Sequence, residues 1–153
     1  MSLLKELRIG GMTVPNRFIR SSLWEKMSDP TGVPSQRLIK TITQLSEGKV
    51  GLILPGVVFP SNKARLNPFQ AGFSNDQQIN GWKPAVENCH KNGSKILFQF
   101  SHGGLRAGVP RAPTQKGDVP QMTISEIEEL IEDFTKAAKG AYRIGADGIQ
   151  LQC

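Results

Sequence analysis

The residues best suited to chemistry are polar side chains and glycines that follow four apolar, β-branched segments. They are Ser21, Ser22, Leu23 and Trp24 after the first segment, Pro55, Gly56 and Val57 after the second, Gln99, Ser101, His102, Gly103 and Gly104 in and after the third, and Gln152 at the end of the fourth. In parallel α/β proteins, ligands bind where the carboxyl ends of the strands meet the loops. The pattern therefore predicts a polar pocket for a small molecule.

Gln99 is the most informative of these residues, because it interrupts the apolar run 95–100, so we expect it to face a buried interior and to need hydrogen-bond partners there. Its amide donates and accepts at once, as recognition of a heterocycle with adjacent carbonyl and N–H groups requires. His102 fits a ligand-binding role and a structural role equally well. The serines, Gly56 and Trp24 also have ordinary structural explanations at strand ends, at a bend and in a core.

Several common catalytic and binding patterns are absent from the sequence. His90 and His102 do not form an HExxH zinc motif, and no P-loop occurs. The glycines at 103–108 do not open a helix in a GxGxxG pattern, which argues against a Rossmann nucleotide site. Cys89 and Cys153 provide neither a disulfide framework nor a CxxC metal pair, so we interpret both as free thiols.

The formal net charge of +6 comes mainly from residues before 117, and acidic residues predominate after it. The basic residues are scattered singly, without interleaved aromatic residues, so we expect no nucleic-acid partner. The longest apolar stretch, 51–59, is much shorter than the about 20 residues of a membrane-spanning helix. The first ten residues lack the apolar region of a secretory signal, so we expect a cytoplasmic protein without a membrane partner.

Three helical patterns alternate with the strand segments, and the clearest begins at Thr123. Thr123 and Glu126 form a capping box, and the segment ends at Gly145. Its predicted buried stripe is Ile124, Ile127, Ile131, Phe134, Ala138 and Ala141. A second pattern runs from a predicted capping box at Ser74 to Gly93 with a break near Pro84, and another lies between Ser35 and Gly48.

The order of elements predicts an α/β fold with a parallel sheet. A small hairpin over 7–14 turns at Gly10 and Gly11, and four strands then alternate with three helices. This is about half of a (β/α)8 barrel, which closes with eight strands and about 250 residues. We expect a single domain over 1–153 that is a truncated protein or a fragment, or that pairs with a second copy to cover its open strands.

Five collinear segments resemble the Old Yellow Enzyme (NADH:flavin oxidoreductase) family. They are 16–22, 51–56, 74–83, 95–104 and 145–151. None is decisive alone, but their shared order over nearly the whole chain argues against coincidence. The resemblance covers the N-terminal half of such an enzyme, through its fourth strand.

The resemblance implies an FMN-binding TIM barrel whose flavin is reduced by NAD(P)H and passes hydride to an activated alkene or another acceptor. Carried over by position, the backbone of Ser22, Leu23 and Trp24 would lie against the flavin. Gly56 would match the small residue under the isoalloxazine edge, and Gln99 the glutamine that bonds the pyrimidine edge. A small residue admits a flat ring, and donors at that edge stabilise the charge of reduced flavin.

The sequence also departs from this family. The family usually ends its fourth strand with His, followed three residues later by His or Asn, a pair that polarises the substrate carbonyl. Gln152 stands at the first of these places and can donate only an uncharged hydrogen bond, which leaves it as a weak catalytic candidate. Leu105 replaces the usual arginine after the third motif.

Two hypotheses follow from these observations. The first is an oxidoreductase of this family, of which this chain alone binds FMN weakly and is inactive, because the family's phosphate site lies in the second half. The second is a non-enzymatic half-barrel that completes itself as a homodimer. An aldolase with a Schiff-base lysine fits less well, because Lys95 begins rather than ends its strand.

Overall fold

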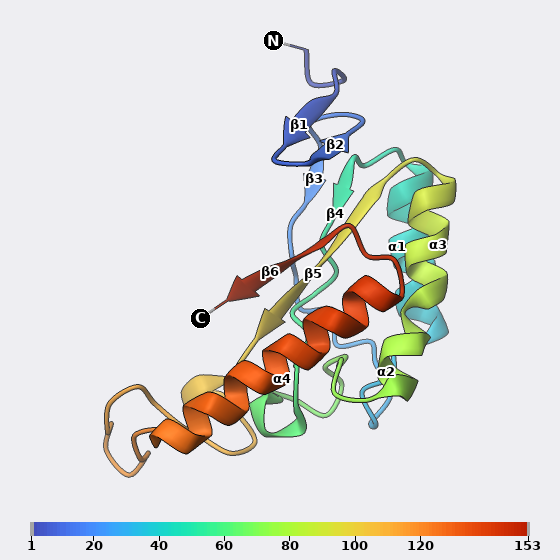
Figure 1. Cartoon of the computed structure of the whole chain (residues 1–153). Coiled ribbons are helices and arrows are strands. Elements are labelled where there is room, and N and C mark those ends of the chain that lie inside the picture. Colours follow the sequence, from blue (N-terminus) through green and yellow to red (C-terminus); the bar gives the residue numbers. More distant parts are fainter. Residues whose placement is uncertain (1, 153) are drawn as a thin grey trace.

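The computed structural model describes residues 2–152, which form a small hairpin and a parallel sheet covered by helices (Figure 1). The strands are β1 (Leu7–Ile9), β2 (Met12–Val14), β3 (Ile19–Arg20), β4 (Leu52–Ile53), β5 (Lys95–Ser101) and β6 (Gly148–Gln152). The helices are α1 (Gln36–Glu47), α2 (Asp76–Gly81), α3 (Lys83–Lys91) and α4 (Ile124–Arg143), with short 3-10 helices η1 (Asn62–Ala64) and η2 (Gly104–Arg106). The order β3-β4-β5-β6 is parallel throughout, which confirms the predicted half-barrel arrangement.

The hairpin β1–β2 closes the amino end of the sheet (Figure 1). Its two strands pair in antiparallel register, and Gly10 adopts the left-handed φ of +57° that the tight turn requires. Val14 is buried against Leu52 and Leu54 of the β4 region. The predicted hairpin is therefore confirmed, and its packing plugs one end of the inner face of the sheet.

The helices cover the opposite, outer face of the sheet. α1 and α3 lie side by side on it, and α4 crosses it beside β6 (Figure 1). Residues alternate along β5, so Phe98 points into the helical core while Gln99 lies on the inner face. The ring of Phe73 lies 4.7 Å from that of Phe98, and the ring of Trp82 lies 5.0 Å from it, measured between centroids. This aromatic cluster anchors the outer core.

The predicted helix boundaries are mostly confirmed, with one correction. The Thr123 capping box is present in both directions, and the helix breaks at Trp82, just before Pro84. The N-cap of α2 is Asn75 rather than Ser74. The Ser74 hydroxyl instead donates to Gln78 Oε1, and Asn75 Oδ1 accepts from the backbone N–H of Gln78.

The predicted buried stripe of α4 is wrong over its first half. Ile124, Ile127 and Ile131 are exposed, Ile124 by 76%, whereas Ala141 is buried. Helical periodicity defines a face but not what covers it, and no part of residues 2–152 buries these three isoleucines. The exposed side chains continue into an apolar groove of about 360 Å³ between α4 and β6, lined by Leu130, Ile131, Phe134, Thr135, Ala138, Ile149 and Leu151.

Cys89 is a free thiol, as predicted, and is completely buried in the outer core. Burial raises the pKa of its thiol to about 12. Cys153 lies outside the described residues. Among the helices of residues 2–152, we find none with the length and apolar character needed to cross a membrane.

Candidate functional site

The inner face of the sheet, opposite the helices, forms a concave region of about 520 Å³. It is lined by Ile19, Ser21, Ser22, Leu52, Leu54, Leu97, Gln99, Ile149 and Gln150. Of the five predicted cofactor residues, Ser22 and Gln99 lie here. The region combines an apolar floor near the hairpin with polar groups toward the carboxyl ends of the strands, as a site for a flat heterocycle requires.

Gln99 is half-buried and faces this open region rather than a closed interior. Its Nε2 donates to Gln150 Oε1 over 2.6 Å, because the two residues are register partners on β5 and β6. The hydrogen bond leaves the carbonyl oxygen and one N–H of the Gln99 amide for a ligand. Sequence analysis missed Gln150, although its spacing of two from Gln152 indicates a shared face of β6.

The Ser22 hydroxyl is buried and has no hydrogen-bond partner among residues 2–152. An unpaired buried hydroxyl costs free energy that a ligand with an acceptor or donor group would recover. The next two residues, Leu23 and Trp24, are exposed at the rim, so Trp24 is not a core residue. Lys26 Nζ lies 4.7 Å from the Trp24 ring centroid, in a cation–π contact.

Gly56 is buried between strand ends, and the space beside its Cα is filled by the chain itself. A Cβ at this position would overlap Glu25 Oε2 and the Leu23 carbonyl oxygen. The Gly56 amide donates to Glu25 Oε1 over 3.2 Å. The glycine is therefore needed for the packing of the rim, and its contact with a flavin edge stays a prediction.

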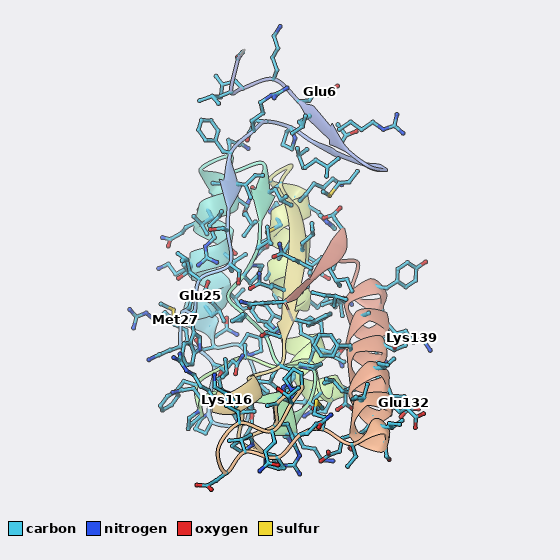
Figure 2. All side chains as sticks on the ribbon, turned by 90° about the vertical axis from the view of Figure 1, so that its left-hand side faces the viewer. Glu6, Glu25, Met27, Lys116, Glu132 and Lys139 are labelled. Carbon is cyan, nitrogen blue, oxygen red and sulfur yellow. The ribbon has the colours of Figure 1, made fainter. Side chains whose placement is uncertain are left out.

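Glu25 also forms an ion pair with Arg20, and both side chains are nearly buried, with exposed fractions of 9% and 14%. Arg20 Nη1 donates to the Leu54 carbonyl oxygen over 2.6 Å. Figure 2 shows Glu25 just beyond the end of β3. The sequence signal for this pair was two opposite charges on either side of the predicted strand end at 21–22.

Gln152, the catalytic candidate, is exposed on β6 opposite Ser101 of β5. Gln150 and Gln152 are two residues apart and therefore lie on the same face of the strand as Gln99. Three neutral amides thus line the edge of the inner face. They can donate and accept hydrogen bonds but bring no charge to a substrate.

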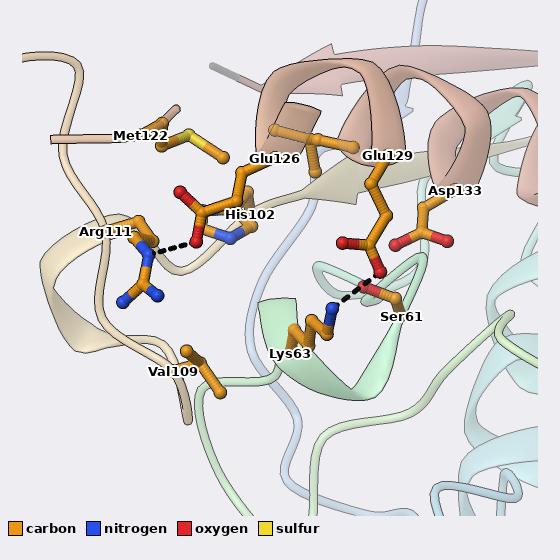
Figure 3. A pocket seen from close by; sticks show the side chains of 10 residues that line it. Ser61, Lys63, His102, Val109, Arg111, Met122, Glu126, Glu129 and Asp133 are labelled. Atoms are coloured by element: carbon orange, nitrogen blue, oxygen red, sulfur yellow. Dashed lines mark hydrogen bonds and ion pairs between the residues drawn. The ribbon is translucent and has the colours of Figure 1, made fainter. Parts of the chain in front are cut away.

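His102 does not join this region. It lines a separate cavity of about 140 Å³ beside α4 (Figure 3), where Lys63 and Glu129 form an ion pair of 2.6 Å and Arg111 and Glu126 another of 2.6 Å. Its Nδ1 accepts from the Gly104 amide, and burial lowers its pKa below 6.5. Within residues 2–152, no cluster of three or more His, Cys, Asp or Glu could hold a metal ion. The structural role of His102 is thus favoured.

Comparison with known proteins shows the family. Residues 2–152 match the NADH:flavin oxidoreductase / NADH oxidase family. An NADH oxidase of Thermoanaerobacter brockii is 30% identical over 164 residues, which cover 98% of this chain and 25% of that protein. An NADPH dehydrogenase of Listeria monocytogenes serotype 4b is 26% identical over 97% of this chain and 47% of its own length.

Solved structures show the same half-barrel. Morphinone reductase in complex with tetrahydroNAD superposes with a TM-score of 0.88 at 26% identity, over 99% of this chain and 49% of that one. An Old Yellow Enzyme homologue from Zymomonas mobilis gives a TM-score of 0.87 at 25% identity, over 99% and 48%. The chain therefore spans about half the length of these structures and half or less of the curated relatives.

Proposed function

Since this chain belongs to the NADH:flavin oxidoreductase / NADH oxidase family, we propose that its inner sheet face and rim bind FMN in an NAD(P)H-dependent oxidoreductase. Bound flavin supplies hydride transfer from NAD(P)H to an activated alkene or another acceptor. The relatives named NADH oxidase and NADPH dehydrogenase, and the morphinone reductase bound to tetrahydroNAD, support the nicotinamide reductant.

The residues present fit a flavin on two independent observations. The buried Ser22 hydroxyl lacks a partner within the described chain and lines the concave region that the ring would enter. The Gln99 amide, oriented by Gln150, keeps one acceptor and one donor for a carbonyl and N–H edge. The concave region of about 520 Å³ is of the size usual for small-molecule sites.

The predicted site residues other than Gly56 then have three roles. Ser22 and Gln99 hydrogen-bond the cofactor, and Leu23 and Trp24 present backbone and apolar surface at the rim. Gln152 donates a neutral hydrogen bond to the substrate. Donors at the pyrimidine edge stabilise negative charge as it develops there, which favours reduction.

The observation that carries this function is the pairing of an unpartnered Ser22 with an oriented Gln99 on one concave face of a family-matched sheet. The test is a fluorescence titration of FMN with the 153-residue chain, followed by an NADPH oxidation assay with cyclohexenone. We expect weak, saturable quenching and little turnover, because the chain spans about half the length of the solved structures it matches. Flavin fluorescence unchanged by the chain would contradict the proposal.

A second candidate is a half-barrel that completes itself as a homodimer. The exposed Ile127 and Ile131 of α4 and the unpaired edge of β6 support it, since apolar surface and free strand edges favour association. Sedimentation at several concentrations tests this candidate: a compact dimer supports it, and a monomer at all concentrations rejects it. We also propose a cytoplasmic location, supported by the free thiol of Cys89.

A further inference from the structure

We propose that the ion pair of Arg20 and Glu25 is a positioning device that holds the rim segments 22–24 and 54–56 in the geometry needed for flavin. The inference rests on the proposed function, because it assigns the rim to the cofactor. It assigns a role to Arg20 and Glu25, which would not contact the ligand themselves but would hold the rim backbone that contacts it.

The geometry connects two strand ends through side chains. Arg20 leaves β3 and donates to the Leu54 carbonyl oxygen, at the end of β4. Its other guanidinium nitrogen pairs with Glu25, which lies beyond the rim segment. Glu25 Oε1 then accepts from the Gly56 amide, so the carboxylate ties the loop after β3 to the loop after β4.

The packing around Gly56 makes this connection tight. The space that a Cβ would need at residue 56 is occupied by Glu25 Oε2 and by the Leu23 carbonyl oxygen. Leu23 is the central residue of the rim segment, so its main chain lies directly against Gly56. The Glu25 carboxylate and the Leu23 main chain thus lie against the same side of Gly56, so we expect a shift of the carboxylate to alter the packing of the segment that carries Ser22.

A purely stabilising role is a poor explanation for a buried ion pair. Desolvation of two charges offsets most of their attraction, and apolar residues of similar volume are often equally stable in the same place. Both side chains here are nearly buried, at 14% and 9% exposure. What an apolar pair cannot supply is the set of directed hydrogen bonds to Leu54 and Gly56.

The test compares the double variant Arg20→Met/Glu25→Leu with Glu25→Gln, in the full chain. The double variant keeps volume and avoids an uncompensated buried charge, while Glu25→Gln keeps shape and an acceptor oxygen for Gly56. The matched control is Asp147→Asn. Asp147 is an equally buried carboxyl, 11% exposed, at the amino end of the same sheet, and it accepts from Lys95 Nζ and the Ile96 amide.

We measure FMN affinity by fluorescence titration and amide exchange of residues 22–26 and Gly56. Loss of one or two net hydrogen bonds predicts an about tenfold weaker FMN affinity and about tenfold faster rim exchange in the double variant. Glu25→Gln leaves the Arg20 charge without its counter-ion and should lower stability, but its amide oxygen can still accept from the Gly56 amide, so its losses of FMN affinity and rim protection should be smaller. Asp147→Asn should lower the thermal midpoint yet leave FMN affinity and rim exchange as in the wild type.

The outcomes separate this inference from the proposed function. Wild-type affinity and wild-type rim exchange in the double variant would overturn the positioning role. If the wild-type chain binds no FMN, the proposed function fails and the assignment of the rim to flavin fails with it. Exchange then decides whether the ion pair orders the rim: faster exchange in the double variant upholds that role, and unchanged exchange rejects it. Equal loss of affinity in Asp147→Asn would also overturn it, because the effect would then be general destabilisation.

Discussion

At the amino end of the parallel sheet, the hairpin β1–β2 covers the inner face, and Val14 is buried against Leu52 and Leu54. At the carboxyl end, the inner face stays open and carries neutral polar groups such as Gln99 and Gln150. Each end also has one carboxylate that joins separate elements. Asp147 does so at the amino end and Glu25 at the carboxyl end.

Asp147 and Glu25 both accept hydrogen bonds from separate elements, but Asp147 supports the fold whereas Glu25 supports the rim of the site. Asp147 receives hydrogen bonds from Lys95 Nζ, the Ile96 amide and His90 Nε2, each within 2.9 Å, and so joins α3, β5 and the start of β6. Asp147 is not itself among the residues that line the concave region. Glu25 instead joins the loops that form the rim, so its loss should affect binding more than folding.

The largest expected effect is at the amino end. Asp147→Ala leaves the Ile96 amide and Lys95 without their acceptor, which should lower the free energy of unfolding by about 3 kcal/mol. Urea denaturation followed by circular dichroism measures this loss. A decrease below about 0.5 kcal/mol, the scatter of ordinary surface substitutions, would show that Asp147 does not hold the amino end.

The next effect is at the carboxyl end. Gly56→Ala places a methyl group where Glu25 and Leu23 already lie, so we expect a loss of about 2 kcal/mol and displacement of the rim. Gly11→Ala is the matched control, because a Cβ there meets no atom within 4 Å. Thermal unfolding of both variants gives the comparison. Equal midpoints for the two would contradict the close packing at Gly56.

A smaller effect concerns the ligand alone. Gln99→Ala removes the side-chain amide on the inner face and its hydrogen bond to Gln150. We therefore expect FMN affinity to fall about tenfold with little change in stability. Gln44→Ala, on the exposed side of α1, serves as control. Fluorescence titration checks the affinity. An unchanged affinity in Gln99→Ala would remove this residue from the site.

The smallest expected effect is a pH dependence of stability that arises from Asp147 at the amino end of the sheet. Burial alone would raise the pKa of Asp147, but the hydrogen bonds from Lys95, Ile96 and His90 outweigh it and hold the pKa below 3.8. This stabilisation is complete above the unfolded pKa near 3.8 and is lost as the pH falls through the lower folded pKa. Melting curves in acid should therefore fall more steeply for the wild type than for Asp147→Asn; parallel curves would argue against the shift.

Local signals in the sequence predicted much of the fold. The Thr123 capping box, the glycine turn of the hairpin and the break before Pro84 depend on residues within a few positions of one another, and all three are confirmed. The polar interruption at Gln99 predicted a residue that needs hydrogen-bond partners, but the surroundings of Gln99 are an open face and not the expected buried interior.

Contacts between distant segments could not be predicted in this way. Glu25 meets the Gly56 amide 31 residues away, and Asp147 meets Ile96 51 residues away, so neither contact leaves a local pattern. The exposed start of α4 was mispredicted for a related reason: Ile124 has helical spacing, but spacing does not show which neighbour covers it.

The buried Cys89 can serve as a chemical probe for opening of the outer core. A thiol with a pKa of about 12 inside a sealed interior reacts with a disulfide reagent only when the surrounding helices part. In a Cys153→Ser background, the rate at which Ellman's reagent reacts with Cys89 would therefore report how often the outer core opens. This measurement needs no cofactor or substrate. It reports on the outer face of the sheet while residues on the inner face are substituted.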